Sequence, residues 1–370
     1  MEFKISKSAL LKELGFVQGI VERKNTIPVL SNLLIESVGN NAVRLVGTDL
    51  DVTLRCEVEA EMVTPGSMCV QARKVFEISR LLPDAPVLFR KEANDWATIE
   101  CERSNFRVAG VPRESFPEIP KFETTQINLP AESFKTFIDR TIFAITQEES
   151  RYTLSGAKFI LNSTGARMVT TDGHRLAFIE SKDVGQAALK SGVDVLIPRK
   201  TLAEIAKLTT GYEGEINFGA DENHVYFGIG PRLLVSRLLS GQFPNYEMVM
   251  PKDNKHSVVF DSGALVQAIR RVAVMADDRS RAIRFHLTAS RLDISSQTAE
   301  EGEARESLIA DYAGDEIDIG FNAQYLQDFL NVLGGGGVRF EFKDSNSQAQ
   351  LRPVEGGEYD YRYVIMPMRL

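Results

Sequence analysis

The sequence predicts an α+β protein of three similar domains, each with two helices and antiparallel sheets. Three observations predict this fold class. The chain has 370 residues, enough for two or three ordinary domains. One order of elements occurs three times: strand, helix, several strands, second helix, several strands. Strand-like runs outnumber helices and follow one another directly, which favours antiparallel pairing.

The first helix of each repeat follows a short strand with alternating apolar residues. The strands begin at Phe3, Ile127 and Val258. Apolar residues then recur at i, i+4 and i+7, which places them on one face of an amphipathic helix. The predicted helices cover residues 6–17, 132–145 and 261–276.

A second helix recurs in each repeat, with strand-like runs on both sides of it. These helices are predicted at 73–83, 199–209 and 322–333. The first two repeats close with FPEI from Phe116 and FPNY from Phe243, and the third closes at the C-terminus. Short polar connectors near 125 and 254 predict domain boundaries. The predicted domains are 1–125, 126–254 and 255–370.

Composition argues against several classes of protein. The chain is 43% hydrophobic, and no apolar run reaches the roughly 18 residues of a membrane helix. The opening MEFKISKSALLKEL lacks the apolar core of a signal peptide. The chain has three cysteines, Cys56, Cys69 and Cys101, and their spacing is not that of zinc ligands. An odd number of cysteines does not form a disulfide framework and is expected in a reducing cytosol. We therefore expect a cytoplasmic protein with no membrane segment, no metal and no cofactor.

The charges are distributed unevenly. The formal net charge is −8, yet the six predicted helices are together net positive. Helices that faced one way would form a basic surface able to bind phosphates without reading sequence. Ordinary solvated Lys and Arg residues would give the same count, so charge alone leaves both interpretations open.

An enzymatic interpretation rests on Asp172 and His174, which could form a general base for a cytosolic hydrolase. No G-x-S-x-G nucleophile motif and no H-E-x-x-H metal motif accompanies them. The run Gly334–Gly337 lacks the Lys-Ser/Thr of a phosphate-binding loop, and it reads as a helix end and turn. A peptide-binding scaffold that never meets DNA is a third hypothesis.

Several segments carry a resemblance that covers the whole chain from Phe3. They are TDGHRLA at 171–177, MPMRL at 366–370, NTIPVLSNLLIE from Asn25, GTDLDV from Gly47, ARK at 72–74, PRK at 198–200, FPNY at 243–246 and GFN at 320–322. With the threefold repeat, the chain resembles the bacterial DNA polymerase sliding clamps, the beta subunits of DNA polymerase III. The resemblance implies a non-enzymatic processivity factor. It also implies a head-to-tail homodimeric ring whose helices line a hole around double-stranded DNA.

The resemblance implies contacts with DNA that do not depend on its sequence. The residues expected near the phosphates are Lys12, Lys24, Arg73, Lys74, Arg151, Tyr152, Arg199 and Lys200. The third repeat has Ala323 and Gln324 where the second has Arg199 and Lys200, so its second helix should contribute little.

The resemblance also implies a pocket between the second and third domains for apolar peptides of the DNA polymerase catalytic subunit, the clamp loader and other clamp-motif proteins. The expected residues are Leu154, Thr171, Gly173, His174, Arg175, Leu176, Pro244, Val249, Asn322, Tyr325, Val364, Met366, Pro367, Met368, Arg369 and Leu370. His174, Arg175 and Arg369 are expected to donate hydrogen bonds to the peptide. Ser280, Met248 and Asn346 depart from the family pattern at the rim of this pocket.

The ring seam is expected to join the first domain of one subunit to the third domain of the next. Its expected residues are Lys74, Arg103, Phe106 and Val108 on one side, and Val274, Met275, Glu300, Glu301 and Glu303 on the other.

Overall fold

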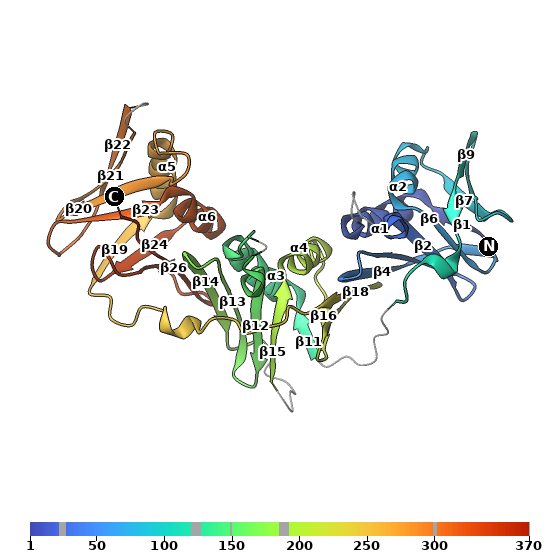
Figure 1. The fold of residues 1–370 in the computed structure, drawn as a ribbon, viewed down its shortest axis with the longest axis horizontal. Helices are drawn as coiled ribbons and strands as arrows, with labels where there is room; N and C mark the ends of the chain where they lie inside the picture. The colour runs from blue at the N-terminus through green and yellow to red at the C-terminus, as the bar shows by residue number, and fades with distance from the viewer. Residues whose placement is uncertain (22–26, 120–126, 149, 185–191, 299–301, 370) are drawn as a thin grey trace. The chain divides into compact units, whose positions relative to one another are not determined.

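The computed structural model describes residues 1–21, 27–119, 127–148, 150–184, 192–298 and 302–369 (Figure 1). The chain forms two compact units. Unit 1 contains residues 1–135 and 200–238, and unit 2 contains residues 136–199 and 239–370. The second repeat is thus divided between the units, and each unit is described by itself.

A nine-stranded antiparallel sheet spans unit 1. In spatial order its strands are β10 (Gly110–Val111), β6 (Ser67–Gln71), β2 (Asn32–Val38), β3 (Ala42–Thr48), β4 (Val52–Glu59), β18 (Arg232–Arg237), β17 (His224–Ile229), β16 (Glu215–Ala220) and β11 (Ile127–Pro130). β4 pairs with β18, with Leu54 opposite Leu234. Backbone hydrogen bonds therefore continue from the first repeat into the second.

A smaller sheet completes the first repeat. Its order is β5 (Glu61–Thr64), β1 (Glu2–Ser6), β7 (Pro86–Lys91), β8 (Ala97–Cys101) and β9 (Ser104–Val108). Helix α1 (Lys7–Ile20) packs on β3 and β4 and lies beside α2 (Ala72–Leu81). Leu10, Leu14 and Val17 of α1 are buried, as the i, i+4, i+7 spacing predicts.

Unit 2 has an eight-stranded antiparallel sheet. Its order is β15 (Val193–Pro198), β12 (Gly156–Asn162), β13 (Gly165–Thr171), β14 (Arg175–Ser181), β26 (Asp360–Ile365), β25 (Ala349–Pro353), β24 (Gly337–Phe342) and β19 (His256–Asp261). β14 of the second repeat pairs with β26 of the third, with Leu176 opposite Val364. This pairing mirrors that of β4 with β18.

A four-stranded sheet and two packed helices complete unit 2. The sheet order is β22 (Gly302–Ile309), β21 (Arg291–Thr298), β20 (Ala282–Thr288) and β23 (Ile317–Asn322). Helix α5 (Ser262–Ala273) packs beside α6 (Ala323–Leu333). Asp261 caps α5 by accepting a 2.7 Å hydrogen bond from the backbone N–H of Ala264, and left-handed Gly334 ends α6.

The predicted α+β class is confirmed, and each predicted helix corresponds to a helix of the structure. The two predicted helices not yet described correspond to α3 (Ala131–Thr141) and α4 (Arg199–Leu208). The prediction ran α3 on to residue 145, but the helix ends at Thr141, and a 3-10 turn covers Ile142–Ala144. Within the part of the chain that the structure describes, no helix has the length and apolar character needed to cross a membrane. The domain boundaries stay a prediction, and the one near 125 lies outside the described residues.

Candidate functional site

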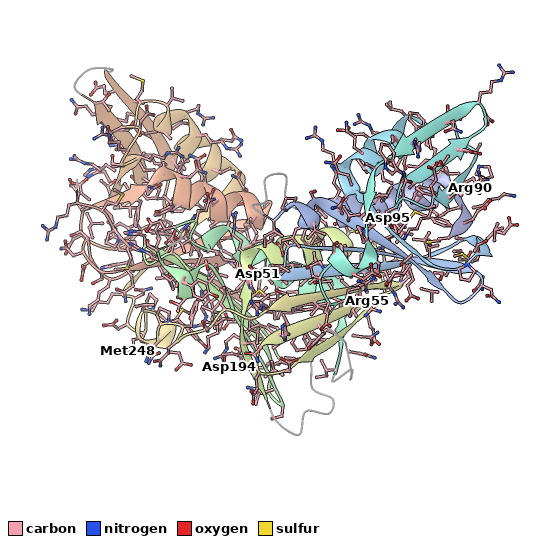
Figure 2. The ribbon with its side chains drawn as sticks, turned by 45° about the vertical axis from the view of Figure 1, so that its right-hand side comes forward. Asp51, Arg55, Arg90, Asp95, Asp194 and Met248 are labelled. Atoms are coloured by element: carbon pink, nitrogen blue, oxygen red, sulfur yellow. The ribbon has the colours of Figure 1, made fainter. Side chains whose placement is uncertain are left out.

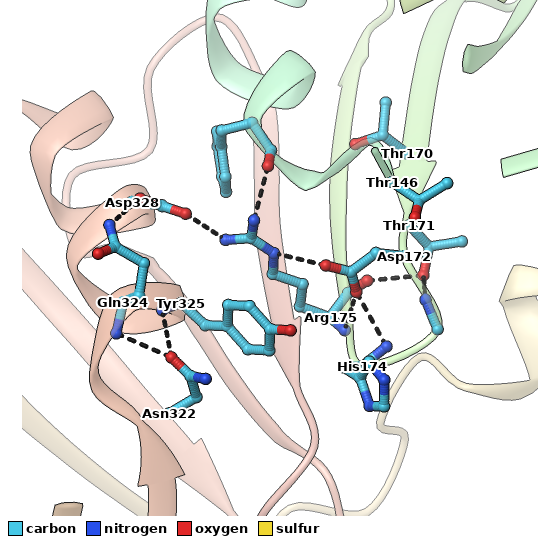
Figure 3. Close-up of polar contacts among 12 residues, drawn as sticks. Thr146, Thr170, Thr171, Asp172, His174, Arg175, Asn322, Gln324, Tyr325 and Asp328 are labelled. Carbon is cyan, nitrogen blue, oxygen red and sulfur yellow. Dashed lines mark hydrogen bonds and ion pairs between the residues drawn. The ribbon is translucent and has the colours of Figure 1, made fainter. Parts of the chain in front are cut away.

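A tight turn between β13 and β14 presents His174 to solvent (Figure 3). Asp172 Oδ1 accepts hydrogen bonds from the backbone N–H groups of His174 and Arg175, at 2.9 and 3.1 Å. Thr171 Oγ1 accepts one from the Gly173 N–H at 3.1 Å and donates one to the Arg175 carbonyl at 2.6 Å. Gly173 has φ +91°, a left-handed conformation that favours glycine. The TDGHR sequence therefore builds its own turn.

The Arg175 side chain ties this turn to α6. Its Nε donates to Asp172 Oδ2 at 3.0 Å, and its Nη1 donates to Asp328 Oδ2 at 2.6 Å (Figure 3). Its Nη2 donates to the Phe143 carbonyl at 2.7 Å, and the guanidinium lies 4.3 Å from the Tyr325 ring centroid. Burial alone would lower the pKa of Arg175, but Tyr363, Asp328 and Asp172 raise it above its usual value.

These contacts show how the chain itself uses Arg175, whose expected contact with a bound peptide stays a prediction. The Arg175 side chain is 9% exposed, and three of its N–H donors serve this chain. A buried guanidinium needs such partners because an unpaired buried charge is strongly destabilising. Arg175 therefore supports the wall formed by the turn.

An apolar cluster lies beside the turn. Its buried members are Val169, Leu176, Phe178, Leu196, Phe243, Tyr246 and Val364, with Leu154, Leu239 and Met250 packed against them. The structure thus brings together Leu154, Leu176 and Val364, as the sequence-based prediction required. Phe178, Leu196 and Tyr246 were not predicted, although the FPNY motif could have indicated Phe243 and Tyr246 as a hydrophobic anchor.

The C-terminal segment is docked against the same turn. The Met366 N–H donates to the His174 carbonyl at 2.9 Å, and the Met368 N–H donates to the Gly320 carbonyl at 2.8 Å. Met366 is nevertheless 42% exposed, so it offers apolar surface next to His174. Leu370 lies outside the described residues.

Helix α6 supplies the opposite side of the candidate site. Asn322 Oδ1 caps the helix by accepting from the N–H groups of Gln324 and Tyr325 at 2.9 and 3.3 Å. The Tyr325 ring stacks with the His174 ring at a centroid distance of 6.5 Å. The exposed Pro244 and Val249 flank the 3-10 turn Tyr246–Met248.

The three positions that depart from the family pattern are exposed or lie in turns. Ser280 donates its backbone N–H to Asp277 Oδ1 at 2.8 Å, and Asn346 donates its backbone N–H to Asp344 Oδ1 at 2.9 Å. Met248 is 78% exposed.

Three of the predicted DNA-facing residues lie on helices α1 and α2 of unit 1. Lys12 is exposed on α1, and Arg73 and Lys74 are exposed on α2, where both pair with Glu77. A groove of about 810 Å³ runs between α1 and α2 and is lined by Arg73 and Arg80 among others. Lys24 lies outside the described residues.

Four other predicted DNA-facing residues have different surroundings. Arg199, the first residue of α4, is exposed. The next residue, Lys200, forms an ion pair with the buried Asp49 carboxylate, which offsets its charge. Arg151 donates from Nη1 to the Asp172 carbonyl at 2.6 Å and pairs with Glu148 at 3.0 Å, whereas the neighbouring Tyr152 is 51% exposed.

One edge strand of each unit carries residues predicted for the ring seam, and within the described residues it pairs on one side only. In unit 1, β9 pairs only with β8; Phe106 on β9 is 37% exposed, Val108 is partly exposed, and Arg103 precedes the strand. In unit 2, β22 pairs only with β21 and carries the exposed Glu303. Such edges can pair with another chain.

The other predicted seam residues are Lys74 of α2, described above, and four residues of unit 2. Val274, which follows α5, is 75% exposed, and Met275 is partly exposed. Glu300 and Glu301 lie outside the described residues.

The hydrolase hypothesis finds no support in this geometry. Both Asp172 oxygens bind groups of the turn itself, and the bond from His174 comes from its backbone. Among the described residues, no group of three or more His, Cys, Asp or Glu side chains could hold a metal ion.

A chain of three repeated α+β modules, with sheets that run from one repeat into the next, defines the class of DNA sliding clamps. Comparison with known proteins supports this class. Models of the N-terminal, central and C-terminal domains of the DNA polymerase III beta subunit match residues 1–120, 128–245 and 247–369. The chain belongs to the DNA polymerase III beta subunit family.

Relatives and solved structures match over complete chains. The beta sliding clamps of Pseudomonas putida and Escherichia coli are 38% and 32% identical, with 100% of each chain covered. The crystal structure of the Pseudomonas aeruginosa beta subunit is 36% identical, covers 100% of both chains and has a TM-score of 0.94. The same clamp solved bound to griselimycin gives the same values. This family consists of processivity subunits, so the hydrolase interpretation of Asp172 and His174 is set aside.

Proposed function

We propose that two copies of this chain close into a ring around duplex DNA and act as the processivity factor of the replicative DNA polymerase. The match of all three domain models along the whole chain carries this proposal. The ring would tether the polymerase catalytic subunit, the clamp loader and other clamp-motif proteins in the cytoplasm.

The helices supply the surface for DNA. Arg73 and Arg199 are exposed in the first turns of α2 and α4, and Lys12 is exposed in the middle of α1. Exposed cations of this kind bind phosphates by releasing counterions. Glu77 and Asp49 offset some of the neighbouring positive charge. A mildly basic surface suits a ring that must slide, because topological linkage replaces tight binding.

Ring closure would use the unpaired edges of β9 and β22, two of the sheet edges among the described residues. The β9 edge of one copy would meet the β22 edge of the next, in a heterologous contact that closes on itself. Exposed apolar groups occur on both sides, with Phe106 on β9 and Ile309 on β22 at 37% and 93% exposure. Arg103 and Glu303 add opposite charges to the two edges.

Partner proteins would dock beside the His174 turn, on the apolar surface of Leu154, Leu176, Val364 and Met366. Methionine gives a deformable apolar surface that suits several peptide sequences. Griselimycin, found bound to a 36% identical clamp, is a ready probe for this site.

Retention on DNA tests the ring. Wild-type protein loaded on nicked circular DNA should stay bound and should be released when the circle is linearised. The variant Arg73→Glu/Arg199→Glu should be retained less well at low salt because it removes two phosphate contacts. Arg90→Glu is the control, since Arg90 projects from β7 on the face opposite the buried Val87 and Phe89 (Figure 2).

Two results would contradict the proposal. One is a monomeric mass by light scattering at the loading concentration, because a single chain cannot encircle DNA. The other is equal retention of the protein on circular and linear DNA.

A further inference from the structure

The turn beside the candidate partner site has a counterpart in the first repeat, at residues 48–52. Asp49 Oδ1 accepts from the backbone N–H groups two and three residues further on, at 3.0 and 2.6 Å, as Asp172 Oδ1 does. The threonine before each aspartate bonds to the same two backbone positions. The two turns are thus the same structure, once in each unit.

Each turn is tied to the second helix of the following repeat, but by different residues. In unit 1, Lys200 on α4 binds the second oxygen of Asp49 directly. In unit 2, Arg175 binds the second oxygen of Asp172 and carries the connection on to Asp328 on α6. The connection is the repeated feature, and its chemistry has changed.

The contacts in unit 2 continue to a further loop. Gln324 Nε2 donates to Asp328 Oδ1 at 2.7 Å, and Arg281 Nη1 donates to Gln324 Oε1 at 2.7 Å. Arg281 ends the loop 277–281, where its N–H donates to the Asp277 carbonyl at 2.7 Å. Asp172, Arg175, Asp328, Gln324 and Arg281 are referred to below as the Arg175 network.

This network explains a departure of the third repeat. Gln324 is the second residue of α6, and Lys200 is the second residue of α4. A lysine at position 324 would present a cation to the cation Arg281 in place of the amide oxygen that accepts its bond. Gln324 can accept from Arg281 and donate to Asp328 at once, which lysine cannot do because it has no acceptor.

We propose that Asp328 and Gln324 are positioning residues of the partner site. Asp328 binds Arg175, and Gln324 binds Asp328. Together they fix the distance between the His174 turn and Tyr325 on α6. Both residues act through Arg175 and need not touch the partner. This inference rests on the proposed function of the site as a peptide-binding surface.

The energetic argument comes from burial. The Arg175 side chain is 9% exposed and the Asp328 side chain is 22% exposed, so their 2.6 Å ion pair is shielded from water. Without the Asp328 charge, the guanidinium would lose its ion pair to α6 and keep its bonds to Asp172 and the Phe143 carbonyl and its contact with the Tyr325 ring. The turn could then shift with respect to α6, and a bound peptide would have to restore the spacing.

The test is griselimycin binding measured by calorimetry on the intact dimer. Asp328→Asn should weaken binding about tenfold, the effect of losing one charged hydrogen bond. Gln324→Met should also weaken griselimycin binding. This variant replaces Asp328→Asn in the test if Asp328→Asn does not fold. Asp328→Glu, which keeps the charge, should recover part of the affinity.

Asp49→Asn is the matched control, because it removes the same kind of charge from the equivalent connection in unit 1. It should leave griselimycin affinity unchanged. A thermodynamic cycle adds a readout that general destabilisation would not give, since the effect of Asp328→Asn should vanish when Arg175 is already Gln.

Three outcomes would overturn the inference. Folded Asp328→Asn could bind with wild-type affinity, Asp49→Asn could weaken binding equally, or the cycle could show no coupling between Asp328 and Arg175. Absence of griselimycin binding by the wild type is a separate result. It would remove the proposed partner site, and this inference with it.

Discussion

The buried ion pair between Glu13 and Arg232 joins α1 of the first repeat to β18 of the second within unit 1. Arg232 donates to the Glu13 carboxylate from Nε at 2.6 Å and from Nη2 at 2.5 Å. The Arg232 and Glu13 side chains are only 8% and 7% exposed. The guanidinium also lies 4.6 Å from the Phe16 ring centroid. Loss of one partner would leave the other without its counter-ion in a buried position.

We predict that Glu13→Gln lowers the free energy of unfolding of unit 1 by about 3 kcal/mol. Breaking a buried, hydrogen-bonded ion pair typically costs about 3–5 kcal/mol, and the glutamine oxygen can keep one of the two bonds. Replacing both residues, as Glu13→Leu/Arg232→Met, should cost less than the single change, because no unpaired charge remains.

The assay uses Trp96, the one tryptophan of the chain, which lies in unit 1. Its fluorescence during urea unfolding reports the stability of that unit. Glu2→Gln is the control, since it removes an exposed ion pair with Arg90 and should not shift the midpoint. The reasoning fails if Glu13→Gln leaves the Trp96 midpoint unchanged, or if the double variant loses more stability than the single one.

Three further predictions concern other parts of the chain. Leu50, with φ +81°, is strained as a non-glycine residue, so Leu50→Gly should stabilise unit 1 by about 1 kcal/mol in the same fluorescence assay; destabilisation would contradict this. Burial would raise the pKa of Asp293, but hydrogen bonds from Ser307 and Arg305 and the nearby arginine charges hold it below its usual value. Its stabilising effect should therefore be present above the unfolded pKa, about 3.9, and be lost as pH falls through the lower folded pKa. Thermal unfolding followed by circular dichroism should show that the midpoints of wild type and Asp293→Asn differ most near neutral pH and converge in acid. A midpoint difference that stays constant with pH would refute this. Burial raises the pKa of the Cys69 thiol to about 12, so iodoacetamide should label Cys69 at pH 8 only after unfolding, as peptide mass spectrometry can check.

Much of the fold could be predicted from local sequence patterns. Helix periodicity depends on residues three and four apart, so Leu10, Leu14 and Val17 identify the buried face of α1 without any tertiary information. The TDGHR turn is equally local, because its hydrogen bonds join residues two to four apart. The repeat and the family resemblance follow from such patterns taken together.

The contacts that join one repeat to the next could not be predicted in this way. The family resemblance implied that Arg175 would donate to a peptide and that Lys200 would face DNA, and both stay predictions. The structure binds Arg175 to Asp328 and Lys200 to Asp49, and each of these pairs is more than a hundred residues apart in the chain. Likewise, Phe178 joins the apolar cluster only once its strand lies in the folded sheet.

The sequence by itself therefore determined the three modules, their helices and the family, because these depend on spacing along the chain. Tertiary structure decided how the second repeat divides between two compact units and which charged side chains are used internally. The physical reason is that a buried charge pairs with an opposite charge that the folded sheets bring within hydrogen-bonding distance. The spacing of residues along the chain does not identify that partner.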